Sequence, residues 1–373
     1  MSQASEPKPD SSDLRAQAHG AGEAARPGDP RLVAWEVTRT CNLHCIHCRA
    51  AATDKPYPGE LTTQECLSVI DQITAFAKPI IIVTGGEPLL RADVFDIVKY
   101  GTGKGLRMVM APNGTLLTEA VARRLKECGV QRISISIDGA TAEVHDDFRQ
   151  MPGAFEGSMR GIRAANAVGL DFQINSSITA KNLGEIPKIL DLAVKLGAKG
   201  LHIFMLVPTG RGENLKGVEI SPEQYEQTLN WFYDQRDKVP FHLKATCAPQ
   251  YYRILRQRAQ AEGKTVTPES HGLDAATRGC LGGQTFCFIS HVGRLQPCGY
   301  LDLDCGNVRR EGFEKAWKES PIFQALRNPK SYKGKCAICK YLRVCGGCRA
   351  RAYAKTGDYL AEEPCCVYQP HVR

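Results

Sequence analysis

The sequence lacks any long apolar run, and this absence excludes several classes of protein. No stretch approaches the roughly 20 apolar residues that a helix needs to cross a bilayer, and we find no hydrophobic leader. The 48 Lys and Arg residues outnumber the 40 Asp and Glu residues, for a formal net charge of +8. These cations form no basic block and do not alternate with aromatic residues. We therefore expect no membrane span and no nucleic-acid partner.

Cysteine, in contrast, is abundant, with 16 residues in a chain of 373. A secreted disulfide scaffold is normally shorter and carries a signal peptide, so we expect reduced thiols that bind metal in the cytoplasm. The chain is 43% hydrophobic, which is enough to build one large domain and a smaller one.

Three of the cysteines, Cys41, Cys45 and Cys48, have the spacing CxxxCxxC directly after an apolar run. A 4Fe–4S cluster has four irons and usually binds cysteine thiolates, so three cysteines leave one iron open to a small molecule. Zinc is the alternative, because His44 and His47 lie within the triplet and can complete a tetrahedral set. Inert buried thiols are a third interpretation. The spacing favours the cluster.

From Leu32 onward, short β-branched runs alternate with amphipathic segments, which is typical of βα units around a parallel sheet. The candidate strands are 33–38, 79–83, 106–111, 132–137, 172–178 and 200–206. The candidate helices are 63–76, 92–103, 118–128, 154–168 and 184–196. Six units are too few for the usual closed barrel of eight strands. We predict an α/β fold with a partial (β/α)6 parallel barrel, open on one side.

Composition predicts four parts of the chain. Residues 1–30 are rich in Ala, Ser, Pro, Gly and Asp without an apolar period, so we expect a disordered tail. Residues 31–210 hold the barrel, 211–277 form a bridging segment, and 278–373 form a C-terminal cysteine-rich domain.

Distinctive residues follow the candidate strands, and parallel α/β folds place their chemistry at the carboxyl ends of strands. The second strand ends in Thr84-Gly85-Gly86-Glu87-Pro88, where two glycines allow a ligand to approach the backbone. The next three strand ends carry Asn113, then Ser136 with Arg149 beyond it, and Asn175. Each motif alone is more often a turn or a loop. Their joint occurrence in this order indicates a site.

Residues 31–210 resemble the radical S-adenosylmethionine (SAM) enzymes, through the segments 41–48, 85–88 and 134–139. The resemblance implies that the open iron chelates the methionine moiety of SAM and that the sulfonium is cleaved to a 5′-deoxyadenosyl radical. It also implies roles for individual residues in binding the cofactor. Gly85, Gly86 and Glu87 would meet the amine, Ser136 and Asn175 the ribose or carboxylate, Arg149 the carboxylate, and Asn113 would lie beside them. His47 replaces the more usual Tyr or Phe near adenine, where it can stack and can also titrate.

A second cysteine field lies between residues 280 and 366. Two zinc sites are an alternative there, because Cys336/Cys339 and Cys345/Cys348 are zinc-like pairs. The field resembles the SPASM extension, which implies an iron–sulfur domain with one or two auxiliary 4Fe–4S clusters. By that resemblance, Cys280, Cys287, Cys298 and Cys348 would hold the first cluster. Cys336, Cys339, Cys345 and one of Cys365/Cys366, taken here as Cys366, would hold the second.

This field departs from the SPASM pattern at one point, because its last internal gap has two residues rather than three. Cys305 is an unassigned extra cysteine that can substitute as a ligand. Cys66, Cys128 and Cys247 are interpreted as structural.

Candidate substrate residues lie between the two cysteine regions: Arg211 in a Gly-Arg-Gly loop, Lys244, Tyr252 and Arg253. Arginine can grip a carboxylate with two hydrogen bonds, and the tyrosines offer flat surfaces, so together they would suit a large, flat polyanion. The alternative is a plain loop and a solvated helix. His44 or His291 can approach the iron, although a lone histidine more often has an ordinary hydrogen-bonded role.

From Arg31 onward the chain is most similar to the tetrapyrrole-modifying branch of the family, and within it to haem synthases. Three stretches carry this likeness: 35–39, 49–50 and 286–300. The resemblance implies oxidative decarboxylation of two propionates of iron-coproporphyrin III to vinyl groups, with an external electron donor such as flavodoxin or ferredoxin. Three alternatives remain open: acetate removal from didecarboxysiroheme, peptide modification, and a non-catalytic iron–sulfur or zinc module.

Overall fold

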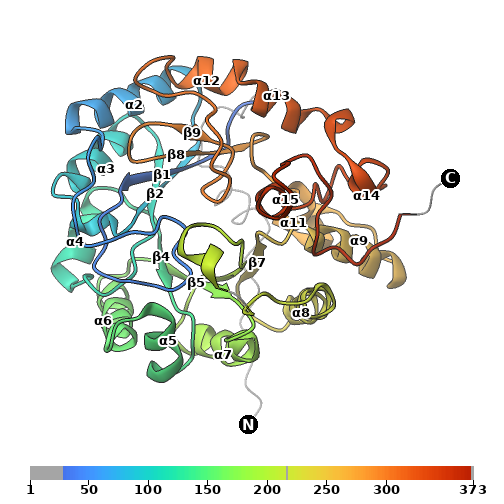
Figure 1. Cartoon of the computed structure of the whole chain (residues 1–373). Coiled ribbons are helices and arrows are strands. Elements are labelled where there is room, and N and C mark those ends of the chain that lie inside the picture. Colours follow the sequence, from blue (N-terminus) through green and yellow to red (C-terminus); the bar gives the residue numbers. More distant parts are fainter. Residues whose placement is uncertain (1–27, 216, 371–373) are drawn as a thin grey trace, which may run out of the picture.

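A single nine-stranded sheet organises the chain. The computed structural model describes residues 28–215 and 217–370, so the predicted tail of residues 1–30 lies outside it except for its last three residues. The strand order is β7-β6-β5-β4-β3-β2-β1-β8-β9, and all neighbours are parallel except β8 and β9. Helices surround the strands in Figure 1, so the first seven strands form an open barrel with helices outside.

The strands are β1 (Leu32–Thr38), β2 (Ile80–Gly85), β3 (Arg107–Met110), β4 (Ile133–Ser136), β5 (Phe172–Ile178), β6 (Gly200–Met205), β7 (His242–Thr246), β8 (Phe286–Ile289) and β9 (Leu295–Gln296). The longer helices are α2 (Thr63–Phe76), α3 (Val94–Gly103), α4 (Glu119–Glu127), α5 (Ala142–Arg149), α6 (Ala154–Ala167), α7 (Ile186–Lys195), α8 (Pro222–Gln235), α9 (Gln250–Ala261) and α15 (Arg349–Thr356). Shorter helices are α10 (Pro268–His271), α11 (Leu273–Ala276), α12 (Phe313–Glu319), α13 (Pro321–Arg327) and α14 (Gly334–Ala337).

All six predicted strands and all five predicted helices are confirmed to within a few residues. Local chemistry explains the sharp helix starts. At α2, Thr62 accepts from the backbone N–H of Glu65 while the Glu65 carboxylate accepts from the N–H of Thr62, a capping box. The segment expected to bridge the two cysteine regions contains a further unit, because β7 pairs with β6 and lies between α8 and α9. The barrel therefore has seven parallel strands in sequence order instead of six.

The two faces of the sheet differ in burial. In β5, Phe172, Ile174 and Ile178 are buried, and the alternating residues Gln173 and Asn175 are only half-buried. The buried set packs with residues of the helices in one continuous core. Because side chains alternate along a strand and the helices cover the outer face, the half-buried polar set faces the interior of the open barrel (Figure 1).

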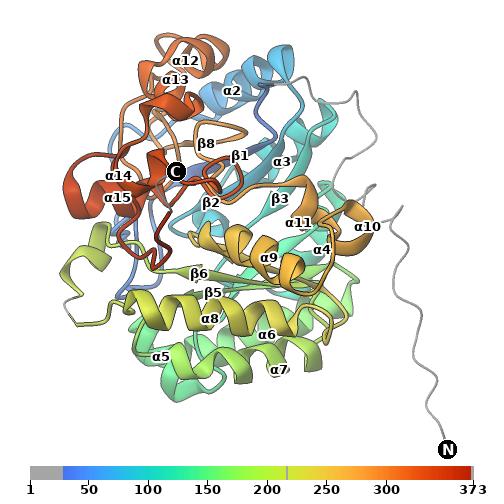
Figure 2. The same ribbon diagram turned by 90° about the vertical axis from the view of Figure 1, so that its right-hand side faces the viewer.

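The C-terminal cysteine-rich region begins as an extension of the barrel sheet. β8 pairs in parallel with β1, with Val33 opposite Cys287. Helix α12 lies beside α2 in Figures 1 and 2, and the backbone N–H of Phe313 donates to Gln72 Oε1 at 2.9 Å. Within the described ranges, we find no helix that is both long and apolar enough to span a bilayer.

Candidate active site

The cysteine triplet lies in the loop that follows β1, and the three thiols gather in one small cluster. Cys41 and Cys45 are buried and Cys48 is half-buried, all as free thiols. Each sulfur accepts one hydrogen bond: from Leu43 N at 3.4 Å, from Arg149 Nη1 at 3.5 Å and from Ala52 N at 3.4 Å, respectively. Burial raises the pKa of Cys41 to about 12. Donors aimed at each sulfur favour thiolate ligands, so the site suits a positively charged iron cluster.

Arg211 holds the backbone of this loop. Its Nε donates to the carbonyl of Cys45 at 2.8 Å, and its Nη1 donates to the carbonyl of Ala52 at 2.6 Å. The preceding Gly210 has φ +58°, and a Cβ there would lie 2.3 Å from the Arg49 carbonyl. The Gly-Arg-Gly loop that sequence placed at the substrate thus packs directly against the cysteine loop. Of the three side-chain nitrogens of Arg211, Nη2 is the one that is buried without a hydrogen-bond partner.

The Gly-Gly-Glu motif after β2 also packs against the cysteine loop. Gly86 N–H donates to Thr38 O and Glu87 N–H to Thr40 O, each at 2.8 Å. A Cβ on Gly86 would lie 2.4 Å from the Thr40 carbonyl, and one on Gly85 would lie 2.5 Å from that of Thr38. Close backbone approach therefore requires both glycines.

Glu87 joins the ends of β2 and β3. Its buried carboxylate accepts from Leu89 N at 3.0 Å and from Asn113 N at 2.7 Å. Burial raises its pKa to about 7. Asn113 Nδ2 donates to Asn42 Oδ1 at 2.8 Å, so this network reaches into the cysteine triplet.

A row of polar residues crosses the interior of the barrel. Ser136 lies opposite Asn175, Asn175 opposite His202, and His202 opposite Lys244. Gln173 Nε2 contacts both Asn175 Oδ1 at 3.0 Å and His202 Nδ1 at 2.9 Å. Ser136 and Asn175, which were expected to bind SAM, thus share one row with Lys244, which was expected to bind the substrate. Burial lowers the pKa of Lys244 and that of His202.

Arg149 and His47 lie on the other side of the cysteine loop. Arg149 Nη2 pairs with Asp138 Oδ2 at 2.5 Å. Although burial opposes the charge, Asp138 and the Cys45 thiol raise the pKa of Arg149. His47 packs on the Phe148 ring at 4.5 Å, and burial lowers its pKa well below 6.5. His47 therefore lies against an aromatic ring, and its burial disfavours the charged form.

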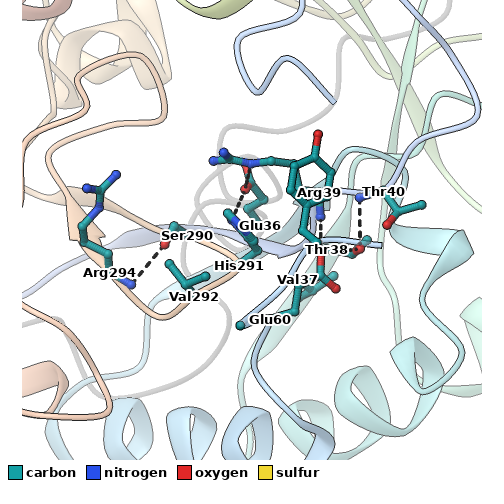
Figure 3. Close-up of polar contacts among 12 residues, drawn as sticks. Glu36, Val37, Thr38, Arg39, Thr40, Glu60, Ser290, His291, Val292 and Arg294 are labelled. Atoms are coloured by element: carbon teal, nitrogen blue, oxygen red, sulfur yellow. Dashed lines mark hydrogen bonds and ion pairs between the residues drawn. The ribbon is translucent and has the colours of Figure 1, made fainter. Parts of the chain in front are cut away.

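Glu36 is the centre of a charged group that joins β1, the cysteine loop and the turn after β8. Its fully buried carboxylate lies 2.9 Å from Arg39 Nε, 2.8 Å from Arg49 Nη1 and 2.8 Å from His291 Nδ1. Figure 3 shows Glu36 at the end of β1 between Arg39 and His291. Burial favours the neutral acid, but Arg49, His291 and Arg39 together hold the pKa of Glu36 well below 4.5.

The surroundings of the Glu36 group bear on two sequence expectations. Arg49 also lies over the Phe288 ring at 4.4 Å. His291 is engaged with the Glu36 carboxylate, and His44 is exposed to solvent. The stretches 35–39 and 49–50 stood out for their resemblance, but only the fold brings Glu36, Arg49 and His291 together.

The four cysteines assigned to the second auxiliary cluster line a single cavity. Cys336, Cys339, Cys345 and Cys366 all face it, while Cys365 lines a different one. Backbone N–H groups donate to two of the sulfurs, from Glu363 to Cys336 and from Gly347 to Cys345, each at 3.4 Å. The donor set and its cavity fit a 4Fe–4S cluster.

Three of the four cysteines assigned to the first auxiliary cluster are neighbours. Cys298 lies close to both Cys280 and Cys348, whereas Cys287 is buried in β8 beside Cys305. No three His, Cys, Asp or Glu side chains between residues 28 and 370, leaving out 216, converge on a position for a single metal ion. A 4Fe–4S cluster binds each thiolate through a different iron, so its ligands surround a larger volume.

Tyr252 and Arg253 lie on the buried side of α9. Arg253 pairs with Glu226 at 2.5 Å and lines the cavity of the second auxiliary set. Tyr252 is 2% exposed and packs edge-on against Tyr251 at 5.7 Å. Tyr252 therefore belongs to the main core, and Arg253 belongs to the surroundings of the second auxiliary set.

Comparison with known proteins agrees with this arrangement. Residues 35–193 match the radical SAM superfamily, and residues 280–348 match the SPASM iron–sulfur cluster-binding domain. An AdoMet-dependent heme synthase of Oleidesulfovibrio alaskensis is 57% identical over 91% of this chain and 88% of the relative. One from Methanosarcina barkeri is 53% identical over 91% of this chain and 97% of the relative.

Solved structures share the fold. Streptococcus suis SuiB bound to S-adenosylmethionine has a TM-score of 0.69 at 13% identity, over 91% of this chain and 78% of that one. The protein anSMEcpe with bound AdoMet and the Cp18Cys peptide has a TM-score of 0.66 at 19% identity, over 90% and 94%. The chain therefore belongs to the radical SAM superfamily and carries a SPASM domain, and it is an enzyme that uses S-adenosylmethionine and 4Fe–4S clusters.

Proposed function

We propose that this enzyme is a haem synthase that converts two propionate side chains of iron-coproporphyrin III to vinyl groups, giving haem b. The observation that carries the proposal is the 53–57% identity to AdoMet-dependent heme synthases over most of both chains. Relatives with other names, an Fe-coproporphyrin III synthase and a pre-heme d1 synthase, are only 30% identical. This gap favours haem synthesis over the acetate-removing and peptide-modifying alternatives.

The stoichiometry of the proposed reaction requires a cluster that cleaves SAM and a second cluster that accepts an electron. When bound, the cofactor and its cluster supply a radical that removes hydrogen from an unactivated carbon. Each propionate loses one hydrogen atom from its β-carbon and then carbon dioxide, and one electron must leave to restore a closed-shell vinyl group. We propose that an auxiliary cluster accepts this electron.

Half-buried positive charge beside the cysteine loop and in the polar row supports a polycarboxylate substrate. Arg39 and Arg49 share the single carboxylate of Glu36, so two guanidinium charges meet one carboxylate charge. Lys244 is half-buried in the polar row, and its pKa is lowered by burial, which an anion would relieve. We propose Arg49 and Lys244 as the main carboxylate-binding residues.

The other three predicted substrate residues are less suited to bind a carboxylate of the substrate. Nη2 of Arg211 has no hydrogen-bond partner and can bind a carboxylate, but Nε and Nη1 donate to backbone carbonyls of the cysteine loop. Arg253 and Tyr252 are buried around α9. For these two we propose support of the second auxiliary cluster, because Arg253 lines its cavity.

A cationic surface beside that cavity supports an acidic electron carrier such as flavodoxin or ferredoxin as the external donor. Lys340 and Arg343 are exposed, and between the cysteines Ile338 is 57% exposed. Opposite charges steer protein partners toward each other, and an exposed apolar residue supplies a contact.

Anaerobic turnover tests the proposed function. The reconstituted enzyme is incubated with iron-coproporphyrin III, SAM and a reductant, and the porphyrin is followed by mass spectrometry. The expected result is two successive losses of the mass of formic acid, carbon dioxide plus two hydrogens. Formation of 5′-deoxyadenosine without any change in the porphyrin would contradict the proposal. Cys45→Ala, which removes a ligand of the catalytic cluster, is the negative control.

A further inference from the structure

Cys247, a cysteine that sequence analysis assigned a structural role, lies directly after β7 at the carboxyl edge of the sheet. Its thiol packs in one cluster with those of Cys348 and Cys298. Cys298 in turn neighbours Cys280. Four thiols therefore form one continuous group at the junction of the barrel and the SPASM domain.

Packing gives the same grouping. Cys247, Cys298 and Cys348 belong to one apolar cluster, which also contains Leu301 and Tyr300. Cys287 belongs to the main core instead, where it is fully buried in β8 and paired in register with Val33. The Cys287 thiol lies near the thiol of Cys305 and near the guanidinium of Arg327.

The backbone of Cys247 is held in an unusual conformation. Its φ is +56°, in the left-handed region that a non-glycine residue rarely adopts. Tyr225 Oη donates to the Cys247 carbonyl at 2.7 Å, and Arg351 Nη2 donates to it at 3.0 Å. Such a conformation persists only when surrounding contacts fix it, and here they hold the backbone from which the thiol projects.

We propose that Cys247 is the fourth thiolate ligand of the first auxiliary 4Fe–4S cluster, together with Cys280, Cys298 and Cys348, and that Cys287 is a core residue. A fourth thiolate closes the coordination of the cluster, which leaves it able to relay electrons but not to bind a substrate. Because Cys247 follows a barrel strand, the cluster is anchored to the barrel itself. Tyr300 packs in the same cluster as Cys247 and Cys298, and Cys48 is also near its side chain.

The test compares Cys247→Ala with Cys287→Ala in the full chain. Both carry Cys41→Ala, Cys45→Ala and Cys48→Ala, so that only the auxiliary clusters remain. After anaerobic reconstitution, iron and sulfide per chain are measured, and the dithionite-reduced protein is examined by electron paramagnetic resonance. For Cys247→Ala we expect either a loss of about four irons or a changed signal from one of the two clusters. Cys287→Ala should keep the iron content and both signals.

Equal changes in both variants, changes in Cys287→Ala alone, or no change in either would overturn the proposal. If Cys247→Ala does not fold, Cys247→Ser, which keeps the size of the side chain, replaces it in the same comparison. The proposal rests on the family assignment and not on the choice of substrate. These readouts need no substrate, so their failure would leave the proposed haem chemistry standing, and failure of turnover would leave this ligand assignment standing.

Discussion

The guanidinium of Arg211 donates from Nε to the carbonyl of Cys45 at 2.8 Å, and so joins the loop after β6 to the loop that carries Cys41, Cys45 and Cys48. This contact changes the expected effect of substituting Arg211. Arg211→Lys keeps the charge but cannot make both backbone contacts, each worth roughly 1.5–3 kcal/mol for a charged donor. We expect the iron content of the catalytic site to fall at least twofold.

Cluster content and substrate kinetics separate the two roles of Arg211. A purely substrate-binding arginine would leave the iron content unchanged in Arg211→Lys and would raise only KM. That pattern would contradict the positioning role. Arg343→Lys, at an exposed position in the SPASM domain, is the control and should change neither.

Gly86→Ala should disrupt the cysteine loop. The added Cβ would lie 2.4 Å from two carbonyl oxygens, those of Arg39 and Thr40, which cannot both move without shifting Cys41. Overpacking of this kind costs about 1–3 kcal/mol or more. We expect SAM cleavage, measured as 5′-deoxyadenosine, to fall by more than about tenfold.

Gly103→Ala is the matched control for that substitution. A Cβ on Gly103 meets nothing within 4 Å, and the residue lies in α3, where alanine favours the helix. The control should cleave SAM at the wild-type rate. Equal activity of Gly86→Ala and Gly103→Ala would show that the close approach of the two loops is not required.

The Glu36 carboxylate should make stability depend on pH. Because its folded pKa is held below the ordinary value of 4.5, its stabilising contribution is present above that value and is lost as the pH falls. Glu36→Gln removes the charge while its cationic partners remain, which costs about 3 kcal/mol for a buried ion pair at neutral pH. The free energy of unfolding of the wild type should therefore begin to approach that of Glu36→Gln only as the pH falls below about 4.5, and should continue to approach it toward the still lower folded pKa.

Anaerobic urea unfolding at several pH values measures this convergence. Glu65→Gln is the control for a surface carboxylate, because Glu65 also has a lowered pKa, near 2, through its hydrogen bonds with Arg309. The exposed pair should contribute little at any pH. A constant difference between wild type and Glu36→Gln across the pH range would contradict the buried ion-pair group.

Cys365 and Cys366 are adjacent in sequence but should behave differently. Cys366 lines the cavity of the second auxiliary set, and Cys365 lines a separate one beside Arg351. Cys366→Ala should lose about four irons per chain, whereas Cys365→Ala should keep them. Iron and sulfide analysis after reconstitution checks this, and the opposite pattern would exchange the two assignments.

The sequence predicted the barrel well because its information there is local. Alternation and caps such as Thr62 and Glu65 set the strands and helices, and the strand-end glycines marked the edge where the chemistry lies. Pairing between distant segments was not predictable in this way. The parallel pairing of β8 with β1 joins residues about 250 positions apart, and no local period encodes it.

The same limit applies to single side chains. Arg211 and Arg253 are both arginines in a bridging segment, yet one holds the cysteine loop and the other lines an auxiliary cavity. Cys247 and Cys287 likewise differ only in where the fold places their thiols. Residue type predicted the chemistry available, whereas the contacts in the fold distinguish residues of the same type from one another.

The most direct test of the central proposal is isotope transfer. Iron-coproporphyrin III carrying deuterium at the β-carbons of its propionates is turned over anaerobically with SAM, and the 5′-deoxyadenosine is analysed by mass spectrometry. We expect 5′-deoxyadenosine that contains one deuterium, formed together with porphyrin that has lost one or two carboxyl groups. Decarboxylated porphyrin accompanied by undeuterated 5′-deoxyadenosine would contradict it.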